Sequence, residues 1–253
     1  MLQPSEYQLV VLECPYRIWD HELVQSLFPK MVSLKLKGYQ TAYGKYCMPI
    51  DTTDFIATHL VLCSKEAGTL QPIMAFRSIE LNRCDEYNVP FSALSLVKAA
   101  KDAGPLVPYV EKSIAECKEA QVKLYYISSW TIRPDIRTSQ QTLNQHLTSL
   151  FASLIWFQHH QQNPIQLIAA ASIQFRVTHL LGLLGFKMIQ YEGVECPSFG
   201  VASLNQTRAR LMDVREFSTY APQLAKKFQA LWENRIVVAD ASGNIDSDDQ
   251  KAA

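Results

Sequence analysis

The feature that most constrains the fold of this chain is the order of apolar segments between Lys123 and Phe186. The first segment, 123–132, is rich in β-branched and aromatic residues, which predicts a buried strand. Pro134 ends it, because proline has no N–H for a strand ladder. The polar residues 135–142 that follow predict a loop at the carboxyl end of this strand.

A helix, a second strand and a second helix are predicted to follow that loop. Residues 143–161 place apolar side chains on one helical face, and Asn163-Pro164 ends the pattern. Residues 165–170 predict a second buried strand, and the next helix is expected to end at Gly185, a residue typical of helix C-termini. In such a unit, a ligand binds between the end of the first strand and the following helix.

The remaining segments predict a single mixed sheet with helices around it. Pro29 is expected to interrupt the first helix, and the tyrosine-rich segment 39–49 is expected to be a loop over one edge of the core. Its tyrosines either cover the rim of the core or line a pocket. The last strand is expected at 199–204, a final helix or helix pair at 213–234, and a disordered acidic tail at 239–253.

Two motifs resemble the GNAT (N-acetyltransferase-like) superfamily: Ile132-Arg-Pro-Asp-Ile-Arg137 and Leu183-Leu-Gly-Phe186. The resemblance implies an α/β fold, a GNAT-like mixed twisted sheet with helices on both faces, over residues 1–238. It also implies a donor site in the loop after the fourth strand. The sequence departs from the family there, because Thr138, Gln140 and Thr142 stand where glycines cradle a pyrophosphate. Leu181 replaces the tyrosine that often acts as general acid.

The segment Asp54-Phe-Ile-Ala-Thr-His-Leu60, with Asp51 before it, is similar to acyl-homoserine-lactone synthases, which are GNAT relatives. Arg77 or Arg83 resembles the downstream arginine of that family. The resemblance extends to N-acyl amino acid synthases, and both groups lack the glycine-rich loop. It implies an acyl donor carried on CoA or on the phosphopantetheine of acyl carrier protein. Ser128-Ser129-Trp130 departs from the Ser-Arg-aromatic triplet of the family.

Acyl transfer from a thioester requires a polarised carbonyl, an amine that loses a proton, and a thiolate that leaves. We interpret Asp54 and Glu80 as candidate general bases, with Arg77 beside them as a candidate catalytic residue. His59 is a further candidate base. For each carboxylate and for the histidine the alternative is structural: Asp54 as a cap, Glu80 as an exposed strand residue, and His59 as a hydrogen-bonded strand residue.

Donor binding is assigned to the end of the first strand and the start of the following helix. The backbone N–H of Trp130 or Ile132 is positioned to receive the thioester carbonyl. A helix N-terminus and its side chains favour a phosphate, although threonine and glutamine permit fewer left-handed conformations than glycine. The candidate donor-site residues are Trp130, Ile132, Arg137, Thr138, Ser139 and Gln141.

Composition excludes several classes of protein. Lysine plus arginine and aspartate plus glutamate both total 24, so no global field attracts nucleic acid or an acidic membrane. No apolar run reaches the roughly 20 residues of a membrane span, and no signal peptide is recognised. The six cysteines show no metal-ligand spacing and predict buried free thiols in a cytoplasmic protein.

The sequence therefore predicts an N-acyltransferase that moves an acyl group from acyl-CoA or acyl carrier protein to a small amine, without a metal. The alternative is a catalytically silent protein of the same fold that binds a ligand or a partner. The substituted glycines and Leu181 favour the alternative, and Asp51, Asp54 and the arginines favour the enzyme.

Overall fold

The computed structural model describes residues 2–175 and 177–240. Within these residues one mixed sheet has the strand order β11-β1-β2-β3-β4-β5-β10-β6, with β9 paired to β10. The sheet strands are β1 (Tyr7–Glu13), β2 (Thr58–Glu66), β3 (Thr69–Glu80), β4 (Lys123–Ile132), β5 (Ile165–Ser172), β6 (Lys187–Met188), β9 (Phe199–Val201), β10 (Thr207–Val214) and β11 (Ile236–Val238). A separate ribbon joins β7 (Gln190–Tyr191) to β8 (Val194–Glu195).

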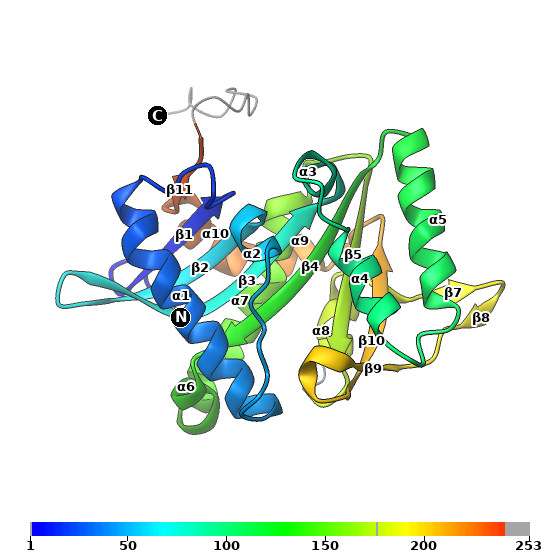
Figure 1. Cartoon of the computed structure of the whole chain (residues 1–253). Helices are drawn as coiled ribbons and strands as arrows, with labels where there is room; N and C mark the ends of the chain where they lie inside the picture. The colour runs from blue at the N-terminus through cyan, green and yellow to red at the C-terminus, as the bar shows by residue number, and fades with distance from the viewer. Residues whose placement is uncertain (1, 176, 241–253) are drawn as a thin grey trace.

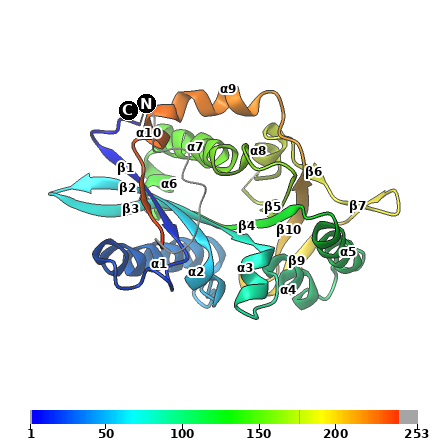
Figure 2. The same cartoon turned by 90° about the horizontal axis from the view of Figure 1, so that it is seen from above.

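Helices cover both faces of this sheet, as the sequence predicts (Figure 1). The helices are α1 (Glu22–Tyr43), α2 (Thr53–Ile56), α3 (Leu81–Glu86), α4 (Ser92–Ala99), α5 (Leu106–Glu119), α6 (Pro134–Ser139), α7 (Gln141–His159), α8 (Val177–Leu183), α9 (Ala221–Ala225) and α10 (Gln229–Glu233), with 3₁₀ turns at Ala202–Leu204 and Lys226–Phe228. Seen from above, α1 to α5 lie on one side of the sheet, and α7 to α10 lie on the other (Figure 2). We call these the α1 face and the α7 face.

The strand β4 separates from β5 halfway along its length. The two strands pair in parallel from Lys123 opposite Ile165 to Ile127 opposite Ala169, and no further pair follows. On its other edge, β4 has one more residue than β3 between two paired positions, and Ser129 has a left-handed φ of 58°. Such a bulge bends a strand and increases its twist. The bend and the lost pairing open a gap in the middle of the sheet.

Helix α1 differs from the sequence prediction, because Pro29 lies inside it and it continues to Tyr43. Proline removes one helical hydrogen bond, but the buried apolar stripe of α1 holds the helix against the sheet on both sides of that position. The predicted interruption at Pro29 is therefore wrong, and residues 39–43 are helical rather than part of a loop. Gly38 lies so close to the side chain of Thr131 on β4 that a Cβ there would collide with the Thr131 hydroxyl.

The expected loop at 135–142 is also wrong, since most of it forms α6 and the first turn of α7. Pro134 occupies the start of α6, where its missing N–H costs nothing. The hydroxyl of Thr138 donates to the Pro134 carbonyl at 3.1 Å, four residues earlier. This bond satisfies the hydroxyl within the helix, so the polar side chain is compatible with α6.

The C-terminal part of the sheet contains two strands that the sequence prediction omits. The segment 199–204 is not the last strand: β10 follows it and lies between β5 and β6, and β11 later pairs in parallel with β1. The helix or helix pair predicted at 213–234 is a pair, α9 and α10, which begins only at Ala221 because Asp213 and Val214 belong to β10. Residues 208–211 of β10 alternate between exposed or partly exposed and buried positions, the strand period that the sequence prediction overlooked. Residues 241–253 of the expected acidic tail lie outside the described residues.

All six cysteines are buried as free thiols. Among the described residues, no helix is long and apolar enough to cross a membrane.

Candidate active site

A cavity of about 880 Å³ occupies the gap between β4 and β5. It is lined from the α1 face by residues of α1, the 48–53 segment and α4, and from the α7 face by residues of α7 and α8. The volume is in the range that encloses a small-molecule ligand. Because lining residues come from both faces, the cavity extends through the sheet where β4 has left β5.

On the α7 face the cavity is mainly apolar. The indole of Trp130 stacks on the ring of Phe151 with centroids 4.3 Å apart, and Leu180 and Leu181 of α8 line the same region. Leu181 is buried, so a side chain without a proton donor lies where the sequence resemblance would place the tyrosine. This side of the cavity suits an aliphatic chain.

On the α1 face the cavity borders a network of charged side chains. Arg77 donates from Nη1 to Asp51 Oδ1 at 2.7 Å and from Nη2 to Asp51 Oδ2 at 2.9 Å, a bidentate pair. Its Nη1 also lies 2.7 Å from Asp54 Oδ2, and its Nε donates to Ser128 Oγ on β4 at 3.1 Å. The Asp51 side chain is 55 % exposed, whereas that of Asp54 is fully buried. Of the two carboxylates, Asp51 is the one that lines the cavity.

Lys35 of α1 completes this network. Its ammonium is buried and pairs with Asp54 Oδ1, and His59 Nε2 contacts the Asp54 carbonyl oxygen at 2.6 Å. Burial opposes ionisation of Asp54, but the charges of Arg77 and Lys35 outweigh it and lower the pKa of Asp54. Burial lowers the pKa of Lys35 to about 8 and that of His59 to about 4. The network of Lys35, Asp54, Arg77 and Asp51 thus holds two cations against two anions.

A row of rings connects this network to the other end of the cavity. Tyr39 and Tyr43, one turn apart on α1, have centroids 5.4 Å apart, and Tyr43 meets Phe175 edge-on at 5.8 Å. The guanidinium of Arg137 lies over the Phe175 ring, 5.1 Å from its centroid. Tyr39 and Tyr43 both line the cavity, while Tyr46 is 93 % exposed. Two of the three tyrosines therefore line a pocket, and the third does not.

Among the described residues, two arginines and no lysine line the cavity: Arg77 and Arg137. Burial lowers the pKa of Arg137, and apart from the ring contact its charge interacts with the hydroxyls of Tyr43 and Tyr39. No carboxylate within the described ranges pairs with it. A partly buried guanidinium without an anion favours a negatively charged group of a ligand.

The structure brings only some of the predicted donor-site residues together. Trp130, Ile132 and Arg137 line the cavity. The hydroxyls of Thr138 and Ser139 donate to carbonyls of their own helix instead, to Pro134 and Asp135 respectively. Gln141 is exposed at the start of α7 and is not part of the lining.

Glu80 lies away from the cavity, in a second polar cluster on the α7 face. It accepts a hydrogen bond from Tyr125 at 2.9 Å, and the Tyr125 ring packs 4.6 Å from that of His159. His159 in turn contacts Ser78 Oγ through Nε2 at 3.1 Å. The expectation that Glu80 faces the cleft is not met: Glu80 points to the face opposite Arg77 and bonds to Tyr125 instead of lining the cavity. Arg83 donates to Ile56 and Thr58 and is also outside the lining.

Lys35 and the two tyrosine side chains of α1 were not assigned to the site from the sequence. The signal for Lys35 was a lysine on the apolar face of a helix, next to Leu34 and one turn after Met31, which are both buried. A lysine in such a position is almost never buried unless it is paired. Among the described residues, no group of three or more metal-ligating side chains gathers.

Comparisons of the sequence alone find no matching protein-family model and no matching curated protein. Comparison of the structure finds a CoA-dependent acyl-homoserine lactone synthase, BjaI, solved with SAM and isopentyl-CoA. The TM-score is 0.50 and the identity 14%, over 92% of this chain and 93% of that one.

Two further similar structures have lower scores. FeeM, an N-acyl amino acid synthase from uncultured soil microbes, has a TM-score of 0.46 and 12% identity over 86% of this chain and 92% of its own. A Drosophila melanogaster polyamine N-acetyltransferase has a TM-score of 0.45 and 10% identity over 82% of this chain and all of its own (100%). The fold assignment rests on the synthase BjaI: the chain has the GNAT-like fold that its sequence resembles.

Proposed function

We propose that this protein transfers an acyl group from a thioester, carried on CoA or on the phosphopantetheine of acyl carrier protein, to a small amine. The observation that carries the proposal is the cavity through the gap between β4 and β5. Its lining includes the Asp51–Arg77 pair and Arg137, with which no carboxylate of the described residues pairs. The Arg137 side suits the phosphate of a donor, and the Asp51 side, which we call the acceptor end, suits an amine.

The backbone of β4 offers the group that polarises the thioester carbonyl. Beyond Ile127 the edge of β4 that faces β5 has no paired strand among the described residues. Backbone N–H groups of Ser128–Ile132 that point into this gap are free for a carbonyl oxygen, and such pre-oriented donors stabilise the charge that develops on it. The acyl chain then lies on the α7 face, against Trp130 and Phe151.

Asp51 holds the acceptor amine beside the carbonyl carbon. The ammonium first gives one proton to water, because only the neutral amine has a lone pair for attack. The nitrogen then attacks this carbon and loses a second proton to water, and the carbon–sulfur bond breaks with its electron pair on sulfur. A thiol has a pKa of about 8.5, so the thiolate leaves without a proton donor at the position of Leu181. Asp54 is buried behind Arg77, so we assign it to positioning Arg77 rather than to contact with substrate.

The alternative, a silent fold that binds a ligand, is favoured by one observation. Thr138 and Ser139 bond to their own helix, so the segment that carries glycines in the GNAT resemblance offers no cradle of side-chain hydroxyls for a pyrophosphate. Arg137 alone would then supply the contact to an anion.

The test measures donor binding and thiol release for the same proteins. Arg137→Ala should weaken binding of CoA and acyl-CoA by about 10- to 100-fold, the range for a lost charge-assisted hydrogen bond. The matched control is Arg133→Ala, four residues earlier, since Arg133 pairs with Glu66 and Asp135 outside the cavity. It should change binding less than twofold.

Calorimetry reports the binding, and release of free thiol from a panel of acyl-CoA and acyl-carrier donors with mixed amines reports the reaction. Binding without release for every donor supports the silent fold. Equal weakening in both arginine variants would remove Arg137 from the donor site.

A further inference from the structure

The charges around the acceptor end of the cavity select the chemical class of the acceptor. Arg77 is the cationic side chain that lines this end in the described part of the chain. Its Nε bonds to Ser128, its Nη1 contacts both Asp51 and Asp54, and its Nη2 bonds to Asp51. Asp51 and Asp54 therefore already occupy the Arg77 guanidinium, the group with which a substrate carboxylate would have to pair.

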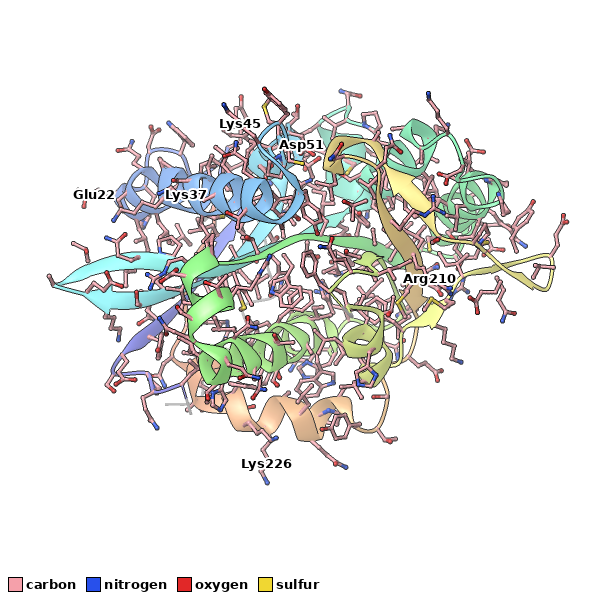
Figure 3. The ribbon with its side chains drawn as sticks, turned by 90° about the horizontal axis from the view of Figure 1, so that it is seen from below. Glu22, Lys37, Lys45, Asp51, Arg210 and Lys226 are labelled. Atoms are coloured by element: carbon pink, nitrogen blue, oxygen red, sulfur yellow. The ribbon has the colours of Figure 1, made fainter. Side chains whose placement is uncertain are left out.

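The other cations near this end do not replace it. Lys35 is buried against Asp54 and is not part of the lining. Lys45 is exposed on the α1 side of the sheet, as Asp51 is, but it is also outside the lining (Figure 3). Arg137 lies after the end of β4, over Phe175, and His179 belongs to α8 on the α7 face.

What the acceptor end does offer is one accessible carboxylate and an apolar wall. The Asp51 side chain is 55 % exposed and accepts from the Thr53 N–H at 2.9 Å, which fixes its orientation. Val89, Pro90 and Leu96, which precede or belong to α4, also line the cavity. An ammonium group beside Asp51 gains a charge-assisted hydrogen bond. A carboxylate on the neighbouring carbon would lie beside a like charge and without a free cation.

We infer that the acceptor is a primary amine with an apolar substituent and no carboxylate next to the amine, rather than an α-amino acid. The inference rests on the proposed acyl transfer, and it narrows the acceptor of that reaction. The bidentate Asp51–Arg77 pair and the second carboxylate, Asp54, together exclude the substrate carboxylate from the one guanidinium at this end.

The experiment uses matched pairs, each an amino acid and the amine left after removal of its α-carboxyl group. Suitable pairs with an apolar substituent are phenylalanine with 2-phenylethylamine, and leucine with 3-methylbutylamine. With donor in excess, kcat/KM should favour the amine of a pair by at least tenfold. Calorimetry of the same compounds, with a saturating CoA thioester or without one, should show the same order of Kd.

Three variants locate the origin of the preference. Asp51→Asn removes the like charge and should reduce the preference for the amine several-fold. Asp20→Asn, an exposed carboxylate outside the lining, should leave the preference unchanged. If an amino acid is used or bound through Arg137, Arg137→Ala will abolish its binding while the amine still binds.

The outcomes separate the two proposals. An amino acid that reacts or binds as well as its amine overturns the inference, as does the failure of both members of every pair to bind. Absence of thiol release with every acceptor overturns the acyl transfer, and the order of Kd values then decides whether the acceptor end still prefers carboxylate-free amines.

Discussion

Two polar clusters lie on opposite faces of strand β3, and only one of them borders the cavity. On the α1 face Arg77 joins Lys35, Asp54 and Asp51 at the edge of a cavity. On the α7 face Glu80 bonds to Tyr125 beside His159, away from any cavity lining. The first cluster has two cations and two carboxylates, and its Asp51 side chain is accessible from the cavity. The second is packed around a buried neutral histidine, so polar residues three positions apart on one strand have different uses.

The largest effect is expected from breaking the charge balance of the first cluster. Asp54→Ala leaves the buried cations Lys35 and Arg77 with one partly exposed carboxylate between them. Removal of one partner from a buried ion pair costs about 3–5 kcal/mol of unfolding free energy. Urea denaturation of the wild type and of Asp54→Ala measures this loss of unfolding free energy. Asp51→Ala, at the exposed end of the same network, should cost less than about 1 kcal/mol. Equal losses would show that Asp54 is not the centre of the network.

The two clusters also each contain a histidine that burial keeps neutral. Burial lowers the pKa of His59 to about 4 and of His159 to about 3, from an ordinary value of 6.5. Below pH 6.5 the unfolded chain therefore binds protons that the folded chain does not, and the free energy of unfolding falls as the pH falls. Each histidine contributes about 1.4 kcal/mol per pH unit, or about 2 kcal/mol at pH 5.

Urea midpoints between pH 7 and 4.5 test this slope, in a window above the ordinary pKa of aspartate. His59→Gln and His159→Gln should each remove about half of the slope. A slope that neither variant changes would mean that both imidazoles are protonated in the folded protein.

Substitutions in the two clusters should also differ in their effect on kcat/KM. Asp51→Asn should lower kcat/KM for the amine by about 10- to 100-fold, the range for a hydrogen bond to a charged group of about 1.5–3 kcal/mol. Glu80→Gln keeps an acceptor for the Tyr125 hydroxyl on the other face and should stay within about twofold of the wild type. Initial rates of thiol release measure both. Loss of turnover in Glu80→Gln without loss of stability would return Glu80 to the reacting groups.

The smallest effect concerns how α1 is held over the first cluster. Gly38→Ala places a methyl group against the Thr131 hydroxyl, and such overpacking costs about 1–3 kcal/mol, which exceeds the gain of up to about 1 kcal/mol that alanine brings to a helix. Gly182→Ala in α8 has no atom within 4 Å of the new methyl group and should stabilise its helix by up to about 1 kcal/mol. Thermal midpoints measured side by side should therefore move in opposite directions. A shift of the same sign in both would mean that helix propensity outweighs the contact at Thr131.

Much of the central fold was readable from the chain because local pattern decides it. The strand β4 begins and ends where the sequence predicts, and β5 begins at the predicted residue, since runs of β-branched and aromatic residues ended by proline have few alternatives. Pro29 and residues 135–139 were misread for the opposite reason. Packing of α1 on the sheet overrules Pro29, and Pro134 starts α6 because proline is tolerated in the first turn of a helix.

The sequence by itself determined which residue types are present for chemistry: Asp51, Asp54, Arg77 and Arg137 were all recognised from it. Only the tertiary structure decided the role of each residue. That role depends on the face of the sheet on which the side chain lies and on the charged groups that are buried beside it. Lys35 and Asp54 are 19 positions apart in the chain, and their pairing takes Asp54 out of reach of the cavity. The gap between β4 and β5 leaves Asp51 and Arg137 lining the same cavity. These residues are far apart in the chain, so no local sequence pattern could predict that they share a site.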